Sequence, residues 1–143
     1  PPPLWIRRQR QMCIRDRMIA TGTGMAPIKS MLMHLLDNKS SRKVRLFFGN
    51  RHETDLFYTD LFRGLKANYP EFEYDMILSS PNPNKWSGYI GRVTDLIEQK
   101  ISDKDSENTE VYLCGGRKMI EDCKQILEEK KFPDASIHFE NFF

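Results

Sequence analysis

The stretch best suited to chemistry is the glycine turn Thr21-Gly22-Thr23-Gly24, which separates a short apolar run from a helical pattern. Its glycines allow a tight turn that brings backbone N–H groups close to a ligand, and a helix N-terminus adds partial positive charge. Pro27 suits the first helical position. Such a turn favours a pyrophosphate, although Pro27 stands where the dinucleotide fingerprint has its third glycine. An ordinary turn between strand and helix is the alternative.

Other residues that could bind or react with a ligand each follow a later apolar run: Asn50, Arg51, Ser79, Cys114, Gly115 and Gly116. An arginine can pair bidentately with a phosphate, and a small polarizable thiol can shape a pocket. The alternatives are an exposed arginine on a solvated loop and a buried structural cysteine. The histidines and cysteines have no metal-ligand spacing, so we expect no metal site.

The elements that must position these residues alternate along the chain. Helical spacing of apolar residues predicts helices near residues 27–36, 54–65, 93–101 and 119–127. Apolar runs predict strands near residues 18–21, 44–48, 72–78, 111–114 and 136–143. This alternation predicts an α/β, Rossmann-like fold: a doubly wound parallel five-stranded sheet with helices on both faces. Because such sheets bind ligands at the carboxyl ends of their strands, where all these loops lie, the sequence predicts a nucleotide site.

Length and composition are those of one ordinary domain of 143 residues. No apolar run approaches the roughly 20 residues of a membrane span, so we expect no transmembrane segment. Three cysteines do not make a disulfide framework, which favours a reducing, cytoplasmic location.

The net charge of +2 arises from the first 17 residues. Five of the 22 basic residues and one of the 20 acidic residues lie there, so the remainder carries −2. A nucleic-acid arm or a targeting segment is possible from composition, but the stretch lacks an apolar targeting core. Residues 12–17 can also be back-translated into a sequencing-adapter end. We therefore expect residues 1–17 to be a non-native or disordered tail, residues 18–143 to be the domain, and nucleic acid not to be a partner.

Five pieces of the chain, in order, resemble the NAD(P)-binding domain of the ferredoxin–NADP reductase family, particularly the reductase components of oxygenases. They are Ala20-Thr-Gly-Thr-Gly-Met-Ala-Pro27, Phe48-Gly-Asn-Arg51 with Asp55-Leu-Phe-Tyr58, Leu78-Ser-Ser-Pro81 with Trp86-Ser-Gly-Tyr-Ile-Gly-Arg-Val93, Val111-Tyr-Leu-Cys-Gly-Gly116 with Met119-Ile120, and Phe139-Glu-Asn-Phe-Phe143. The resemblance covers residues 18–143. The family places a flavin-binding barrel before this domain, and residues 1–17 carry none of its motifs. The resemblance thus implies a truncated reductase, inactive without its flavin domain.

The resemblance also implies roles for individual residues. The cofactor-binding set is Thr21, Gly22, Thr23, Gly24, Pro27, Asn50, Arg51, Ser79, Tyr89, Gly115, Gly116 and Met119. Cys114 would lie beside the nicotinamide, Glu140 at the flavin–nicotinamide junction, and Phe142 against the flavin ring. Gly116 departs from the proline of many relatives. The alternatives are that Phe142 is a core residue of an edge strand and that Tyr89, like Trp86, only pins its loop.

The function implied is hydride delivery from NAD(P)H to FAD, with FAD held by the missing upstream domain. Electrons would pass on to an acceptor protein such as a ferredoxin or an oxygenase component. NADH is expected over NADPH, because Ser79-Ser80-Pro81 lacks the arginine that NADP-using relatives carry there. A non-catalytic nucleotide-binding or adaptor module is the alternative. A receiver-type signalling domain fits poorly, since the strand ends lack clustered acidic residues.

Overall fold

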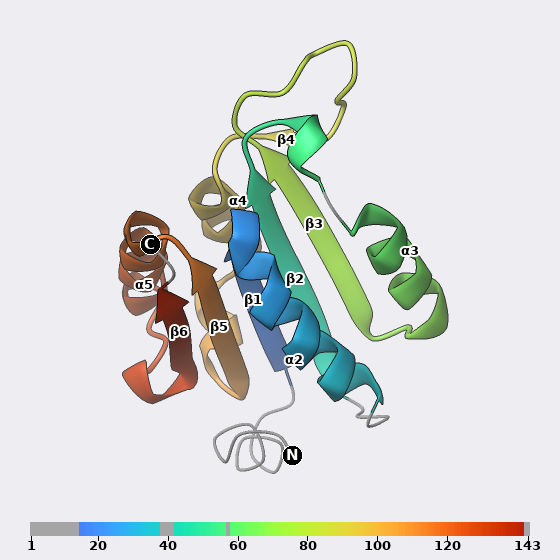
Figure 1. Cartoon of the computed structure of the whole chain (residues 1–143). Helices are drawn as coiled ribbons and strands as arrows, with labels where there is room; N and C mark the ends of the chain where they lie inside the picture. Colours follow the sequence, from blue (N-terminus) through green and yellow to red (C-terminus); the bar gives the residue numbers. More distant parts are fainter. Residues whose placement is uncertain (1–14, 38–41, 57, 142–143) are drawn as a thin grey trace.

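A computed structural model describes residues 15–37, 42–56 and 58–141. Within these ranges the strands form one parallel sheet of six, in the order β4-β3-β2-β1-β5-β6 (Figure 1). The strands are β1 (Arg15–Thr21), β2 (Lys43–Asn50), β3 (Phe72–Leu78), β4 (Tyr89–Ile90), β5 (Thr109–Gly115) and β6 (Ile137–Asn141). The α-helices are α2 (Met25–Asp37), α3 (Thr59–Asn68), α4 (Val93–Lys100) and α5 (Arg117–Glu129).

The sheet grows outward from β1 in both directions. The chain adds β2 and β3 on one side of β1 and then returns to add β5 and β6 on the other. This confirms the predicted doubly wound fold and places its switch point between β1 and β5. The predicted five strands are all present, and β4 is an addition. Its two residues pair with Ile77 and Leu78, which is too short a run to leave a pattern in the sequence.

Side chains alternate between the two faces of the sheet, as successive residues of a strand must. Met18 and Ala20 pack with α2 and α3 on one face, whereas Ile19 packs with α4 and α5 on the other. All three are fully buried, as expected for a central parallel strand that is covered on both sides. Figure 1 shows α2 in front of the sheet and α4 behind it. The two cores fix how the strand ends are placed.

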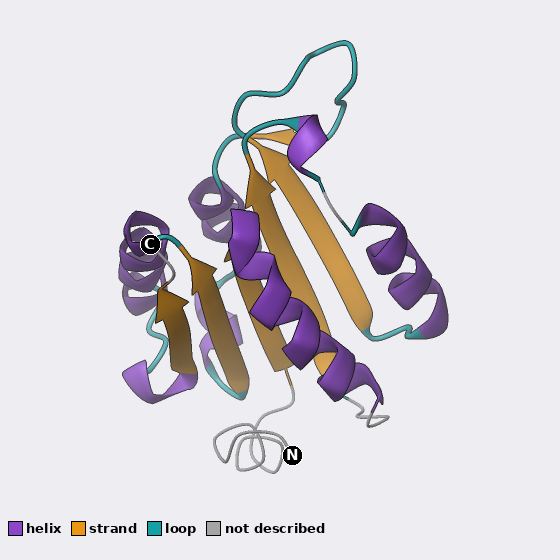
Figure 2. Ribbon diagram, in the orientation of Figure 1, coloured by secondary structure: helices purple, strands orange, loops and turns teal. Residues whose placement is uncertain are grey.

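Two helices begin at residues other than those predicted. Figure 2 shows the helices, the strands and the loops between them. The helix α2 starts at Met25, so Pro27 is its third residue and not its first. Its missing N–H is still one of the four that have no partner within a helix. The helix α3 starts at Thr59, not at Thr54. Thr54 lies in the 3-10 turn η2 (Glu53–Asp55), and Tyr58, which precedes α3, adopts a left-handed conformation with φ of 69°.

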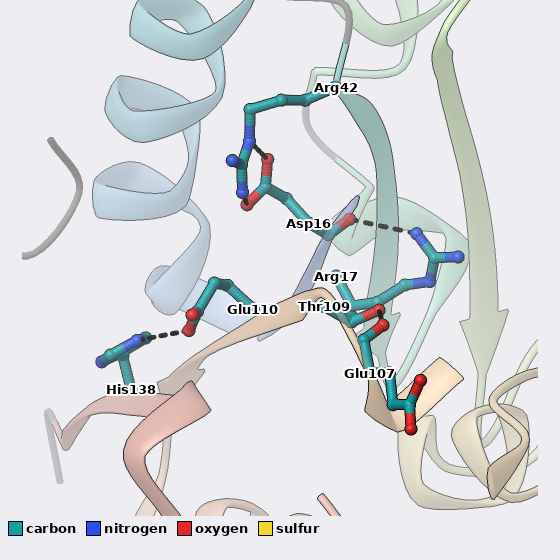
Figure 3. A network of polar contacts seen from close by, with 7 residues as sticks. All are labelled: Asp16, Arg17, Arg42, Glu107, Thr109, Glu110 and His138. Carbon is teal, nitrogen blue, oxygen red and sulfur yellow. Dashed lines mark hydrogen bonds and ion pairs between the residues drawn. The ribbon is translucent and has the colours of Figure 1, made fainter. Parts of the chain in front are cut away.

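The first strand begins at Arg15, three residues before the domain start expected from the sequence. The carboxylate of Asp16 is fully buried and accepts hydrogen bonds from Arg42 Nε at 2.6 Å and Nη2 at 2.5 Å (Figure 3). Arg17 donates from Nη1 to the carbonyl oxygen of Asp16 at 3.3 Å. Residues 15–17 therefore belong to the sheet, and residues 1–14 lie outside the described part of the chain.

Candidate dinucleotide site

The carboxyl ends of β1, β2 and β3 meet the first turns of α4 and α5 around a cavity of about 300 Å³. Its lining comprises Thr21, Gly22, Gly49, Asn50, Arg51, Ser79, Gly91, Arg92, Val93 and Met119. Six of these were predicted from the sequence as cofactor-binding residues. The fold brings them together although they come from the ends of three strands, the segments that directly follow them, and one helix.

A second cavity, of about 600 Å³, lies on the α2 side of the same strand ends. It shares Gly22, Asn50 and Arg51 with the first cavity, and Met25, Ala26, His52, Asp55 and Tyr58 complete it. Because the two cavities share three residues, they form one crevice at the carboxyl ends of β1, β2 and β3, next to the switch point. The first turns of three helices, α2, α4 and α5, contribute to this crevice. Their unpaired N–H groups give it a positive potential.

The loop after β1 packs directly on the loop after β5, and glycines make this possible. A Cβ on Gly24 would overlap the carbonyl oxygen of Cys114 and lie 2.6 Å from its carbonyl carbon. Gly115 has φ of +159°, and a Cβ there would lie 2.5 Å from Thr21 Oγ1 and 2.6 Å from Met119 Cε. Gly22, with φ of +53°, also has a backbone conformation that favours glycine. Glycine at these positions thus allows the loop after β1, the candidate phosphate loop (residues 21–24), to pack directly against the end of β5.

One buried polar atom in the crevice has no partner among the described residues. It is the amide nitrogen Nδ2 of Asn50, at the end of β2. A buried donor without a hydrogen bond is costly, so an acceptor on a ligand would stabilise it. The donor set of the crevice is therefore an amide, an arginine and helix N-termini, which fits a phosphorylated, hydroxyl-rich ligand.

Hydrogen bonds join the loop after β2 to the loop after β3. They run from Ser79 N to Asn50 O at 3.0 Å, from Ser80 N to Arg51 O at 2.9 Å, between His52 Nδ1 and Ser80 O at 2.8 Å, and from Asn82 N to Glu53 Oε2 at 2.9 Å. The last bond holds the pKa of Glu53 below its ordinary value, because the N–H of Asn82 favours the charged carboxylate. These bonds fix the backbone that carries Arg51 and Ser79 at the crevice.

A third cavity, of about 450 Å³, lies between α2 and the strands β5 and β6. Cys114, Glu140 and Pro27 are part of its lining. The Cys114 side chain is only 2% exposed, and its burial, with the charge of Glu140, raises the pKa of this thiol to about 12. It therefore stays protonated at neutral pH, which does not suit a thiolate nucleophile but allows it to shape a pocket.

The same cavity has a polar side beside Cys114 and Glu140. His138 Nε2 lies 2.8 Å from Glu110 Oε2 (Figure 3), and its ring stacks on Tyr112 at a centroid distance of 5.3 Å. Phe142, predicted to stack on a flavin, lies outside the described residues. The structure thus places two of the three predicted catalytic residues in one cavity.

Tyr89 and Trp86 do not line the three cavities described above. The indole Nε1 of Trp86 donates to the carbonyl oxygen of Tyr89 at 2.9 Å, and the Tyr89 ring lies 5.2 Å from Lys100 Nζ. These contacts favour the alternative that both aromatic side chains pin their loop. Gly116, also predicted to bind the cofactor, is the N-cap of α5.

The sequence alone missed several lining residues, chiefly Arg92, Val93, His52, Asp55 and Tyr58. Arg92 and Val93 start α4 directly after a glycine, and a helix start at the carboxyl edge of a sheet was a usable signal. The other three lie in the segment between β2 and α3, where the sequence predicted a loop at His52 and a regular helix from Thr54 onward. Asp55 was placed there in a helical first turn and not in a pocket.

Two kinds of feature are absent from the described residues. No helix in this part of the chain has the length and apolar character needed to cross a membrane. No group of three or more His, Cys, Asp or Glu side chains within the same ranges could hold a metal ion.

A doubly wound parallel sheet with a glycine turn, helix N-termini and an unpaired amide at its switch point defines a dinucleotide-binding domain. Residues 18–125 match the family described as "Oxidoreductase NAD-binding domain", and the chain belongs to this family. Such domains bind NAD(P) in flavoprotein reductases, where the nicotinamide passes a hydride to FAD. Membership agrees with the resemblance inferred from the five sequence motifs.

Similarity to individual known proteins supports the same family membership. The chain is 32% identical over 125 residues to the phenol hydroxylase P5 protein of Acinetobacter pittii, covering 87% of this chain and 35% of that protein. It is 33% identical over 128 residues to one component of the Na(+)-translocating NADH-quinone reductase of Shewanella denitrificans, covering 87% and 31%. The crystal structure of a cytochrome P450 reductase from Amycolatopsis superposes with a TM-score of 0.82 at 25% identity, covering 99% and 40%. The chain thus spans about a third of the length of these two curated relatives.

Proposed function

We propose that this chain supplies the NAD(P)H-binding half of a flavoprotein reductase whose flavin-binding domain lies elsewhere in the protein. When both cofactors are bound, the nicotinamide supplies a hydride that FAD accepts, for onward transfer to an acceptor protein such as a ferredoxin or an oxygenase component. The observation that carries this proposal is the convergence of the glycine turn, Asn50, Arg51 and three helix N-termini on one crevice.

The residues of this chain have binding and positioning roles in this proposal. The backbone of Thr21, Gly22 and Gly24 holds the pyrophosphate, and the buried amide of Asn50 donates to an oxygen of the dinucleotide. Cys114 and Glu140 lie in the neighbouring cavity between α2 and β5, where they shape the space next to the nicotinamide. The protonated, buried thiol contributes volume and excludes water there without reacting.

The proposal is tested by comparing Asn50→Ala with the control Asn84→Ala, which changes an exposed residue of the loop after β3. Loss of one hydrogen bond to the ligand should weaken NADH binding by Asn50→Ala about tenfold, or ~1.4 kcal/mol, while stability stays the same or rises. Isothermal titration calorimetry and urea unfolding measure the two quantities. Equal NADH affinity in the wild type and both variants would contradict the proposal.

We further propose NADH as the preferred nucleotide. Of the two arginines in the crevice, Arg92 is held by Asp122 at 3.6 Å, and the carboxylate of Asp55 shares the second cavity with Arg51. Arg51, whose charge is offset by the carboxylate of Asp55, is a weak partner for a 2′-phosphate dianion. The measurement is kcat/KM for NADH and NADPH with the full-length reductase. A preference for NADPH of about tenfold, ~1.4 kcal/mol, would contradict this choice.

A further inference from the structure

We propose that His52 is a second, proton-dependent cation of the crevice, so that a ligand bearing an additional phosphate monoester gains affinity as the pH falls. The inference rests on the proposed function, because the phosphate concerned is the 2′-phosphate that distinguishes NADPH from NADH. It assigns to His52 a part in nucleotide selectivity.

His52 lies at the cavity on the α2 side of the strand ends. His52 directly follows Arg51, and both line the cavity of about 600 Å³ together with the first turn of α2. Asn50, whose Nδ2 is buried and unpaired among the described residues, lines the same cavity. An anion that entered this cavity would therefore meet Arg51, an amide donor and a helix N-terminus, with His52 beside them.

The two ring nitrogens of His52 have different roles. Nδ1 lies 2.8 Å from the carbonyl oxygen of Ser80. A carbonyl oxygen only accepts hydrogen bonds, so Nδ1 carries a proton in this contact, whether the ring is neutral or charged. Only Nε2 is then left to take a further proton, and it becomes a donor when the ring is charged. The bond to Ser80 holds the ring at the cavity in both states.

Charged groups of both signs surround His52. On its own segment, Asp55 accepts a hydrogen bond from the His52 backbone N–H at 3.2 Å, and Arg51 and Glu53 are its neighbours. The charges of His52 and Lys85 both lower the pKa of Glu53, and from α2 Lys29 reaches the Tyr58 ring at 5.0 Å. With His52 neutral, Asp55 offsets Arg51 at this cavity. With His52 protonated, two cations and one carboxylate line the cavity, because Glu53 is not among its lining residues.

The change proposed at His52 is the binding of one proton. One solvent proton binds Nε2, the ring becomes +1, and Nε2–H can then donate to a phosphate oxygen. A 2′-phosphate itself loses negative charge near pH 6, which works in the opposite direction. A test must therefore compare the pH profile of the protein with that of a variant that cannot protonate at position 52.

The test uses 2′,5′-ADP and 5′-AMP as stable probes and isothermal titration calorimetry on the 143-residue chain. His52→Gln keeps an N–H donor for Ser80 and stays neutral. His34→Gln, at the far end of α2, is the matched control. From about pH 8 to about pH 6, we expect selectivity for 2′,5′-ADP over 5′-AMP to rise about three- to five-fold more in the wild type and in His34→Gln than in His52→Gln.

Identical pH profiles of selectivity in the wild type and His52→Gln would overturn the inference. Binding of NADH separates this result from failure of the proposed function. If NADH binds all three proteins and the profiles coincide, only the role of His52 is lost. If NADH binds none of them at millimolar concentration, the proposed function fails, and the inference about His52 fails with it. Inorganic phosphate alone should compete weakly, because it lacks the adenosine that places the 2′-phosphate at His52.

Discussion

Replacement of Gly24 by alanine should disturb both the fold and the crevice through a single methyl group. The new Cβ would overlap the Cys114 carbonyl oxygen, and it would lie 2.6 Å from the carbonyl carbon and 3.0 Å from the Gly115 Cα. All three atoms are backbone, so no side chain can rotate away. Reaching ordinary van der Waals contact, which starts at 3.4 Å, requires the two loops to separate by most of an ångström.

The magnitude follows from that geometry. Overpacking of this kind costs about 1–3 kcal/mol, and we expect the upper half of that range because the strands β1 and β5 resist separation. The displaced loop also presents its N–H groups less well to a pyrophosphate. Loss of one charge-assisted hydrogen bond, ~1.5–3 kcal/mol, should weaken NADH binding at least about tenfold.

The assay is urea unfolding together with NADH titration, and Gly64→Ala is the control. Gly64 lies inside α3 with open space around it, so alanine there should stabilise the protein by about 0.5–1 kcal/mol through helix propensity. The midpoints should therefore move in opposite directions at an unchanged m-value. If Gly24→Ala matches the wild type in both midpoint and NADH affinity, the packing of the phosphate loop on β5 is not as described.

Three further predictions address other parts of the chain. Arg42→Met should lower the free energy of unfolding by about 3–5 kcal/mol, because it leaves Asp16 buried without its partner. A loss under about 1 kcal/mol in urea unfolding would mean that this pair is not buried. In the full-length reductase, Cys114→Ala should lower kcat more than it raises KM, since a residue beside the nicotinamide acts mainly at hydride transfer; unchanged kcat with lower thermal stability would indicate a core role instead. Burial raises the pKa of both Cys114 and Cys123 to about 12 from 9.0, so the stability that each neutral thiol contributes is complete below about pH 9 and is lost as the pH rises toward about 12. Cys123→Ala should therefore show a shallower decline of the urea midpoint between about pH 8 and pH 10 than the wild type, and parallel declines would count against this assignment.

The sequence predicted the strands and the two-sided core because these depend on local hydrophobic patterns. Buried runs such as 44–48 and 111–114 allow few alternatives in a parallel sheet. The two residues of β4 gave no such signal, since their pairing depends on where the preceding loop returns. The start of α3 was wrong for a related reason. The apolar spacing after Thr54 continues through Tyr58, whose left-handed backbone conformation separates a 3-10 turn from the helix.

The candidate site was predictable where it depends on backbone geometry. Gly22 and Gly24 follow a strand and precede a helix, which is a local pattern with a physical reason. Arg92 and Asp55 were missed because their approach to the crevice depends on how distant segments pack together. Nothing in the sequence indicated that Arg15 and Arg17 lie in a strand, because both are charged and their position in β1 follows from pairing with β2 and β5 and not from hydrophobicity.

The central claim is that a nicotinamide dinucleotide binds across the switch point between β1 and β5. An amide NMR titration of the chain with NADH tests it most directly, because each backbone N–H reports separately. We predict saturable chemical-shift changes at Gly22, Gly24, Asn50 and Gly115. Little change is expected at the opposite edge of the sheet, where the amino ends of β2 and β3 lie near Lys43 and Glu71. Shifts confined to that opposite edge, or none at millimolar NADH, would contradict the claim.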